Sequence, residues 1–280
     1  MARRAAWARS LAMCGKNYLM DWIYLSPHFD DVALSCGGLV WEQARAGQAV
    51  EIWTICAGDP GPRPLSEFAL RLHARWGSGA EGVEIRRAED LRSCQALEAQ
   101  PRHFSLPDCI YRTAPPTEPP FGAPPSEAPP SEAPPLYTSE QAILGPIHPL
   151  ETGLVQSLRR ELGLVLPARA NLVSPLGLGG HVDHRLARAA AETLDRPLWY
   201  YADYPYVLGW VEEASQVTAG MEAVSFPVSP AALEAWEAAV AAHASQISTF
   251  WSDGEAMRAA LHDYYHRSGS FQLWRNPNLP

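Results

Sequence analysis

Residues 22–40 constrain the fold more than any other part of the chain. They open with an apolar run, residues 22–25, whose β-branched and aromatic side chains are typical of a buried strand, and Pro27 ends that run. Three groups that can bind a metal or transfer a proton follow at once: His28, Asp30 and Asp31. A small, glycine-containing run comes next and can open a helix. Because ligands of open α/β sheets bind at the carboxyl ends of strands, this pattern predicts a reactive site there.

The spacing within this loop suggests a metal site. In a strand-to-helix turn, His28 and Asp31 are three residues apart and can face the same point, whereas Asp30 between them points elsewhere. A catalytic zinc site usually takes three protein ligands drawn from His, Asp or Glu and keeps one position for water. One ligand is therefore missing from this loop.

The best source of the missing ligand is the run G-G-H-V-D-H at residues 179–184. It follows a strand-like run, residues 171–175, and precedes a helical pattern of apolar residues. Its two histidines, His181 and His184, can supply one ligand and one hydrogen-bond donor, and spacing alone leaves open which is which. Either cluster by itself is more often a solvated turn or a surface pair. Two such clusters, each directly after an apolar strand, favour a functional site.

Composition and charge limit the alternatives. With 280 residues, of which 47% are hydrophobic, the chain can bury a full core, and one α/β domain with insertions is expected. The net charge of -9 argues against nucleic acid as a partner, because phosphate binding needs a basic surface. The sequence has neither an 18-residue apolar run nor a G-x-S-x-G motif, so it predicts no membrane span and offers no support for a serine hydrolase.

The amino-terminal segment and the cysteines indicate a cytoplasmic protein. Residues 1–20 are basic, but their apolar stretch is too short for a signal sequence, so a mobile arm is expected. The five cysteines show no C-x-x-C motif and no paired spacing, which favours reduced thiols in a cytoplasm. Three of them fall within apolar patterns and are predicted to be small core residues: Cys36, Cys56 and Cys94.

Apolar patterns predict alternating strands and helices along most of the chain. The exception is a proline-rich insertion at residues 113–135, which contains P-P-S-E-A twice and favours an extended spacer, with a ligand segment for another protein as the alternative. Strands are expected at residues 22–25, 50–56, 103–108, 171–174, 198–201 and 222–228. Helices are expected at residues 33–46, 66–76, 85–99, 153–162, 186–194, 230–247 and 254–266. The first strand–helix–strand unit predicts parallel strands with a right-handed crossover.

The motifs P-H-x-D-D and G-G-H-x-D-H, in this order and after these strands, resemble those of the PIG-L/LmbE family of metal-dependent N-acetyl-sugar deacetylases. The resemblance implies a Rossmann-like three-layer α/β/α fold with a mostly parallel sheet. It also implies that residues 21–280 form a single LmbE-like deacetylase domain. The expected activity is removal of an acetyl group from an N-acetylated amino sugar, such as N-acetylglucosamine, or its conjugate.

The resemblance also assigns roles to individual residues. A divalent ion, expected to be zinc with Mn, Fe or Ni as alternatives, would be held by His28, Asp31 and His184. Asp30 would be the general base, protonated His181 would stabilise the oxyanion, and Asp183 would orient His181. An R-x-x-E pattern places Arg86 at the substrate, and Asp108 matches a substrate-contacting Asp.

Other functions remain open at this stage. A pseudoenzyme could bind a sugar in the same cavity without hydrolysing it. An amidase acting on a thiol conjugate, or a deacetylase of a glycosylated natural product or lipid, would keep the chemistry and change the substrate. The loops at the cavity rim decide among these substrates. Related proteins are often homo-oligomers, and the sequence does not define the assembly.

Overall fold

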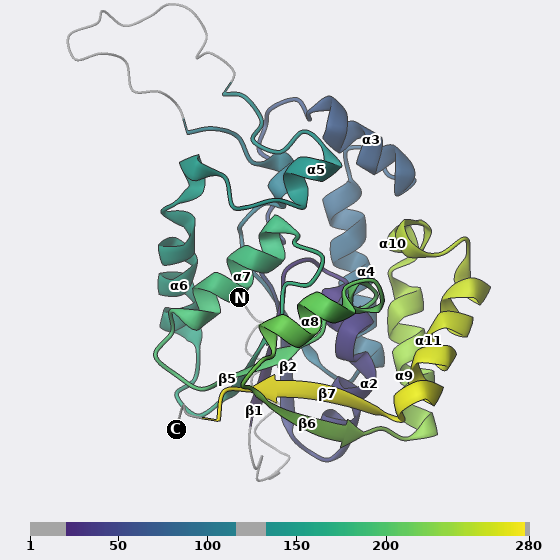
Figure 1. The fold of residues 1–280 in the computed structure, drawn as a ribbon. Helices are drawn as coiled ribbons and strands as arrows, with labels where there is room; N and C mark the ends of the chain where they lie inside the picture. Colours follow the sequence, from purple (N-terminus) through teal and green to yellow (C-terminus); the bar gives the residue numbers. More distant parts are fainter. Residues whose placement is uncertain (1–20, 116–132, 278–280) are drawn as a thin grey trace, which may run out of the picture.

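The computed structural model describes residues 21–115 and 133–277, and its centre is one seven-stranded sheet (Figure 1). The strand order is β3-β2-β1-β4-β5-β7-β6. Five neighbouring strands run parallel: β1 (Asp21–Ser26), β2 (Ala49–Thr54), β3 (Gln100–His103), β4 (Asn171–Pro175) and β5 (Leu198–Tyr201). β7 (Ser270–Arg275) pairs antiparallel with β5 and with β6 (Glu222–Pro227). The sheet is therefore mostly parallel, as predicted.

The side chains of β1 explain why the parallel strands are continuous apolar runs in the sequence. Trp22 and Tyr24 face one hydrophobic core, and Ile23 and Leu25 face another. All four side chains are buried, because helices cover both faces of a parallel sheet.

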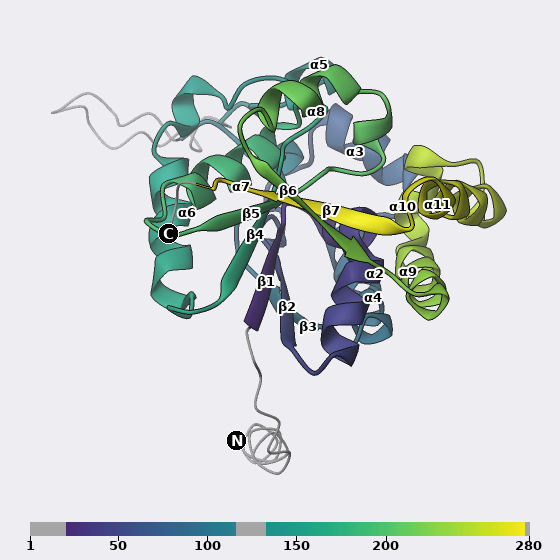
Figure 2. The same ribbon diagram turned by 60° about the horizontal axis from the view of Figure 1, so that its bottom comes forward.

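Helices lie on both sides of the sheet, and Figure 2 shows the three layers. The core that contains Trp22 is closed by α2 (Asp31–Arg45), α4 (Gly82–Ala96), α9 (Pro230–Ala242) and α11 (Gly254–Ser268). The opposite core is closed by α6 (Leu154–Val165), α7 (Val182–Glu192) and α8 (Val211–Val217). This arrangement confirms the predicted Rossmann-like three-layer fold.

The strand order reverses between β1 and β4, which are hydrogen-bonded neighbours in the middle of the sheet. From β1 the chain continues to β2 and β3 on one side, and from β4 it continues to β5 on the other. The loops that follow β1 and β4 therefore diverge and leave a crevice at their carboxyl ends. Both sequence motifs lie in these two loops.

Short helices in the longer connections surround this end of the sheet. They are α3 (Glu67–Arg75), α5 (Glu140–Ile143), α10 (Ala244–Phe250), η2 (Cys109–Tyr111), η3 (Pro149–Glu151) and η4 (Tyr206–Leu208). The ends of the proline-rich insertion come together, because Thr113 and Pro135 form an isolated antiparallel bridge. The expectations for residues 1–20 and 116–132 lie outside the described residues.

The structure departs from the predicted elements at the carboxyl end. The single helix expected at residues 230–247 is two helices that meet at His243. Glu89 explains the break, since its carboxylate accepts hydrogen bonds from the backbone N–H and the hydroxyl of Ser245 at 2.9 and 2.6 Å, at the start of α10. The sequence also did not predict β7, which lies between β5 and β6.

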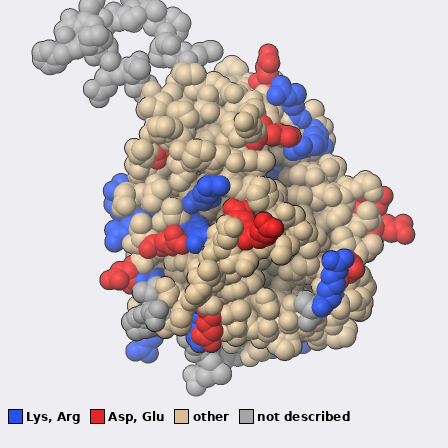
Figure 3. All heavy atoms as spheres, in the orientation of Figure 1, with Lys and Arg blue, Asp and Glu red and all other residues tan. Residues whose placement is uncertain are grey.

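On the face drawn in Figure 3, basic and acidic side chains are interspersed on a mainly uncharged surface. Among the described residues, no helix is both long enough and apolar enough to cross a bilayer.

Candidate metal centre

The loop after β1 brings His28 and Asp31 together. Asp31 is the first residue of α2, and its Oδ2 accepts the backbone N–H of His28 at 2.7 Å and lies 3.1 Å from His28 Nδ1. Ser26 ties the loop down, since its hydroxyl donates to the carbonyl of His28 and accepts the N–H of Val32. The predicted convergence of His28 and Asp31 is therefore present in the structure.

The loop after β4 turns tightly through glycine. Gly179 and Gly180 have φ values of +78° and +75°, a region that favours glycine. A Cβ at Gly179 would also lie 2.9 Å from the ring of Tyr206. The turn places His181 at the amino-terminal cap of α7 and His184 in its first turn.

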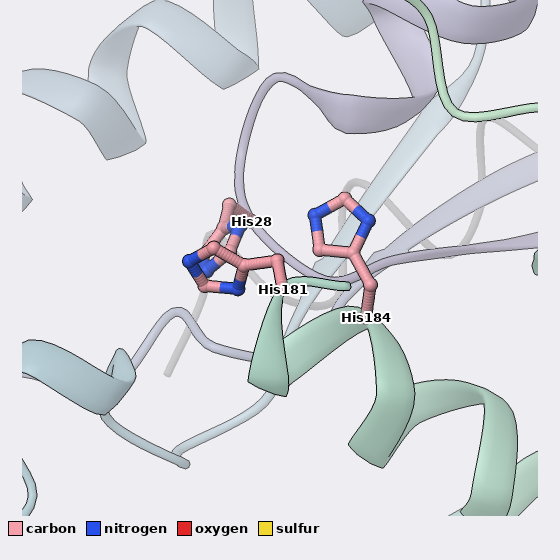
Figure 4. Close-up of side chains that lie close together, drawn as sticks. All are labelled: His28, His181 and His184. Atoms are coloured by element: carbon pink, nitrogen blue, oxygen red, sulfur yellow. The ribbon is translucent and has the colours of Figure 1, made fainter. Parts of the chain in front are cut away.

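The two loops meet around three imidazole rings, as Figure 4 shows. The ring centroids of His28 and His184 are 5.5 Å apart, and that of His181 lies 4.7 Å from His28 and 5.3 Å from His184. A ligand nitrogen from each ring lies within 4.8 Å of the other two. Asp31 sits between two of the rings, because its Oδ1 is 3.3 Å from His184 Nε2. The three predicted metal ligands thus share one location.

Asp203 supports His184 from behind. Its Oδ1 lies 2.7 Å from His184 Nδ1, and its Oδ2 accepts the backbone N–H of Leu178 at 3.0 Å. With Nδ1 facing a carboxylate, Nε2 is the nitrogen directed at Asp31 and the site. No sequence motif marked this role of Asp203, although its position directly after the predicted strand 198–201 was an available signal.

Asp30 contacts Arg86 of α4. Arg86 Nη2 donates to Asp30 Oδ1 at 3.2 Å, and Nη1 lies 3.5 Å from Asp108 Oδ2. The guanidinium also stacks over the ring of Trp76 at 4.8 Å. The two predicted substrate-binding residues, Arg86 and Asp108, are thus linked to the predicted base.

Asp183 is arranged differently from the expectation. Its carboxylate faces His28, with Oδ2 at 3.1 Å from His28 Nε2, instead of orienting His181. Only its backbone N–H contacts His181, donating to Nδ1 at 3.2 Å. The difference arises because Arg112 and the backbone N–H of Cys109 bind the carboxylate of Asp183 and turn it toward the other loop.

Arg112 anchors a buried network that no sequence pattern indicated. Its Nη1 donates to Asp183 Oδ1 at 2.6 Å, and its Nε donates to Glu151 Oε1 at 2.6 Å. Tyr137 donates to the second oxygen of Glu151 at 2.6 Å. Arg112 lies beside the proline-rich insertion, and no local pattern marked it. The network ties the floor of the site to the segment that carries α5.

The site carries an excess of negative charge. Ion pairs and hydrogen bonds connect six buried carboxylates at the site. The same network contains only two guanidinium groups, those of Arg86 and Arg112. The carboxylates are Asp30, Asp31, Asp108, Glu151, Asp183 and Asp203. Four negative charges therefore have no arginine to balance them. A divalent cation among mixed nitrogen and oxygen donors fits this charge distribution.

Burial and these charges shift the pKa values of the three histidines in opposite directions. Burial alone would lower the pKa of His184, but Asp31 and Asp203 outweigh it and raise that pKa to about 10. The pKa of His28 is likewise raised, against burial, by Asp108, Asp183 and Asp31. Burial and the neighbouring His28 instead lower the pKa of His181 to about 3, so its ring is neutral. Since Nδ1 of His181 accepts the N–H of Asp183, the proton is on Nε2. The expectation of a protonated His181 is therefore replaced by a neutral N–H donor.

A cavity of about 310 Å³ opens onto these residues, near the lower end of the range of roughly 300–1,000 Å³ found for small-molecule sites. His28, Asp30 and Arg86 line its floor, and Tyr206 and Phe250 are among its apolar walls. A larger cavity of about 740 Å³ is lined by residues from 60–66, 106–115, 133–135 and 150–157. It contains none of the predicted site residues.

The sheet is mostly parallel and Rossmann-like, and its His/Asp cluster lies where the strand order reverses between β1 and β4. These features define the class of the protein: an α/β protein with a candidate metal centre at the carboxyl ends of its strands. The family model described as PIG-L, GlcNAc-PI de-N-acetylase, matches residues 23–194, more than half of the chain. This chain belongs to the PIG-L family.

Similar proteins include one curated relative and several solved structures. The chain is 28% identical over 200 residues to 2'-N-acetylparomamine deacetylase of Niallia circulans, and the match covers 66% of each chain. The zinc-inhibited form of teicoplanin deacetylase Orf2 is 25% identical with a TM-score of 0.68, over 91% of this chain and 97% of that one. A40926 pseudoaglycone deacetylase Dbv21 shares the fold at 21% identity and a TM-score of 0.63, over 91% and 96% of the two chains. The match to the curated relative falls just short of two thirds of its length.

Proposed function

We propose that this chain is a metal-dependent hydrolase that removes the acetyl group from an N-acetylated amino sugar or its conjugate. The observation that carries the proposal is Asp31 lying between His28 and His184, in the same cavity as Asp30. Family membership supports the reaction class. The similar proteins named as deacetylases support it as well.

His28, Asp31 and His184 are the residues proposed to hold the ion. Zinc is the proposed metal because two imidazoles and one carboxylate match its preferred donors, with Mn, Fe or Ni as alternatives. Asp203 acts in support by fixing the orientation of the His184 ring. When bound, a divalent ion here supplies a Lewis acid that acidifies water and polarises an amide carbonyl.

Asp30 is the proposed general base. It takes a proton from the attacking water and later delivers it to the amine leaving group. Arg86 holds the Asp30 carboxylate at 3.2 Å and so fixes its direction without occupying its second oxygen. The same guanidinium, together with Asp108, borders the cavity and is proposed to contact substrate hydroxyl groups.

His181 is the proposed oxyanion donor. Its neutral ring keeps Nδ1 on the backbone of Asp183, which leaves the Nε2–H to donate to the tetrahedral oxyanion. The aromatic side chains of Trp76, Tyr206 and Phe250 line the cavity and can pack against the apolar faces of a sugar ring.

A panel of N-acetylated amino sugars and their conjugates, assayed for released acetate and free amine, tests the proposal. We expect acetate release that a chelator abolishes and that added zinc restores. Binding of these compounds without acetate release, by protein loaded with metal, would support the pseudoenzyme instead. Hydrolysis restricted to acylated thiol conjugates in the same panel would support the amidase.

The proposed cytoplasmic location rests on the thiols. The four cysteines among the described residues, Cys36, Cys56, Cys94 and Cys109, are all free and buried. Reduced thiols are the usual state in a cytoplasm. The proposed partner is a small acetylated sugar conjugate, and a homo-oligomer remains part of the expectation from the family.

A further inference from the structure

The short helix α10 contributes a polar side chain to the cavity that the proposed mechanism does not use. Gln246 lines the cavity of about 310 Å³, as do Thr249 and Phe250 of the same helix. Gln246 is only 6% exposed. A buried amide needs defined hydrogen-bond partners, because an unpaired polar group away from water costs free energy. The partners that Gln246 has within the protein therefore indicate which of its groups can serve a ligand.

A chain of hydrogen bonds fixes the orientation of this amide. The hydroxyl of Ser245 donates to Glu89 Oε2 at 2.6 Å, since a carboxylate only accepts hydrogen bonds. This hydroxyl has a single proton, so its oxygen can only accept from Gln246, and Gln246 Nε2 donates to it at 2.9 Å. An amide turned the other way would set Oε1 against the Ser245 oxygen with no proton between them. The order of donors thus directs Oε1 of Gln246 away from Ser245.

Both ends of α10 are held, so its side chains have fixed positions at the cavity wall. At the start of the helix, Glu89 of α4 binds the backbone N–H and the hydroxyl of Ser245. At the end of the helix, the ring of Phe250 packs edge-to-face against that of Tyr206, with centroids 5.9 Å apart. An amide on such a helix is oriented before any ligand binds, which is what selective recognition requires.

The amide oxygen suits a neutral hydrogen-bond donor. A charged ammonium that leaves water needs a carboxylate partner, whereas the oxygen of an amide is a sufficient partner for a hydroxyl. The proposed metal ligands lie in the loops after β1 and β4, so a bound acetyl group would lie there and α10 would border another part of the sugar. A hydroxyl group on the sugar ring is therefore the group that fits Gln246.

We propose that Gln246 determines substrate specificity by accepting a hydrogen bond from one ring hydroxyl of the N-acetylated sugar through Oε1. The inference rests on the proposed function, since that function supplies the sugar. Ser245 and Glu89 act as positioning residues, because they orient the amide from behind the residues that line the cavity. The substrates are thereby narrowed to sugars in which this hydroxyl is free, and a sugar that lacks it binds more weakly.

Sugar binding by the Asp30→Asn variant, loaded with one equivalent of zinc, tests the proposal, because this variant should hydrolyse the sugar too slowly to disturb a titration. Calorimetry compares methyl N-acetylglucosaminide with analogues that each lack one ring hydroxyl. We expect one analogue to bind about 10-fold more weakly than the parent sugar, the scale of one hydrogen bond. Adding Gln246→Leu should weaken binding of the parent by a similar factor and abolish its advantage over that analogue.

Two further variants separate recognition from a general structural effect. Gln216→Leu is the matched control, since Gln216 is exposed on α8, and it should keep the full difference between the two sugars. Ser245→Ala removes the hydroxyl that orients the amide, so it should reduce the difference although Gln246 is still present. Should Gln246→Leu fail to fold, Ser245→Ala decides.

The two proposals fail in different ways. Failure of the parent sugar to bind, equal binding of the parent and every analogue, or a difference that persists in Gln246→Leu would overturn the role of Gln246. Acetate release by the wild-type protein would be unaffected by any of these results. A wild-type protein that binds the sugars with the expected difference but releases no acetate would instead overturn the proposed function.

Discussion

Asp203 Oδ1 lies 2.7 Å from Nδ1 of His184, and the other nitrogen of that ring lies 3.3 Å from Asp31. The imidazole is therefore held between two carboxylates, Asp31 on the side of the proposed metal centre and Asp203 behind the ring. A carboxylate behind a metal-binding histidine fixes the ring and makes it a better donor. Asp203 should thus act on the metal without touching it.

Replacement of Asp203 with Asn should weaken metal binding by about 10- to 100-fold, because the amide cannot supply the negative charge behind the ring. Competition with a chelating dye measures the change. Asp195→Asn is the matched control, since Asp195 is exposed and lies in the connection between α7 and β5, before the strand that Asp203 follows. Equal metal affinities of the two variants would contradict the supporting role of Asp203.

Asp30→Asn should keep the metal and lose turnover by about 10²- to 10⁴-fold, the usual contribution of a general base. The amide can still accept from Arg86, so the loop should keep its conformation. Elemental analysis and acetate release measure the two properties. Asp59→Asn, an exposed aspartate paired with Arg87, should be close to wild type. Full activity of the Asp30 variant would contradict its role.

The two histidines of α7 should respond differently to replacement by Ala. His184→Ala should lose both metal and activity, since it removes a ligand. His181→Ala should retain the metal and lose about 10²- to 10³-fold in turnover, as expected for an oxyanion donor. His262→Ala, an exposed histidine on α11, is the control. If His184→Ala retains one metal per chain, His184 is not a ligand.

The sequence could predict that the proposed metal ligands lie close together, because these residues stand directly after two strands. His28 and Asp31 are three apart in one loop, so their convergence follows from local geometry. Their meeting with His184 depends on β1 and β4 being neighbours, which the α/β topology implies. All eight predicted site residues lie within the described part of the chain.

The supporting residues could not be predicted in the same way. Arg112 and Glu151 reach the site from irregular connections, and their roles depend on where Asp183 points. A carboxylate has two oxygens and several partners within reach, so spacing does not determine its direction. The strand β7 was missed for a related reason, since its pairing with β5 joins segments far apart in the chain.

The break between α9 and α10 shows how tertiary contacts override local propensity. Residues 230–247 have a composition that favours one continuous helix. A buried carboxylate on another helix, Glu89, binds the N–H and hydroxyl of Ser245 and so starts a new helix there.

Arg112→Met should destabilise the protein by about 3–5 kcal/mol, the range for removing one partner of a buried ion pair. The change leaves both Asp183 and Glu151 without their guanidinium partner. Denaturant unfolding of the metal-free protein measures it. Arg267→Met should change stability by only a few tenths of a kcal/mol, since it breaks an exposed i, i+4 pair with Asp263. Similar decreases in the free energy of unfolding of the two variants would show that the buried Arg112 network stabilises the protein no more than an exposed ion pair does.

The stability of the metal-free protein should fall as the pH rises above about 6.5. The folded-state pKa of His184 is raised to about 10, and that of His28 is raised as well, so both rings bind protons more tightly in the folded state. Their contribution to the free energy of unfolding is complete below the unfolded-state pKa of about 6.5. As the pH rises from there toward the folded-state pKa, each ring loses about 1.4 kcal/mol of this contribution per pH unit. Urea unfolding with a chelator, at about pH 6.5 and about pH 9.5, measures this loss. The metal-loaded protein is the control, because a bound divalent ion displaces these protons and should remove most of the decline. A metal-free protein that is equally stable at both values would show that the two rings do not hold protons in the folded state.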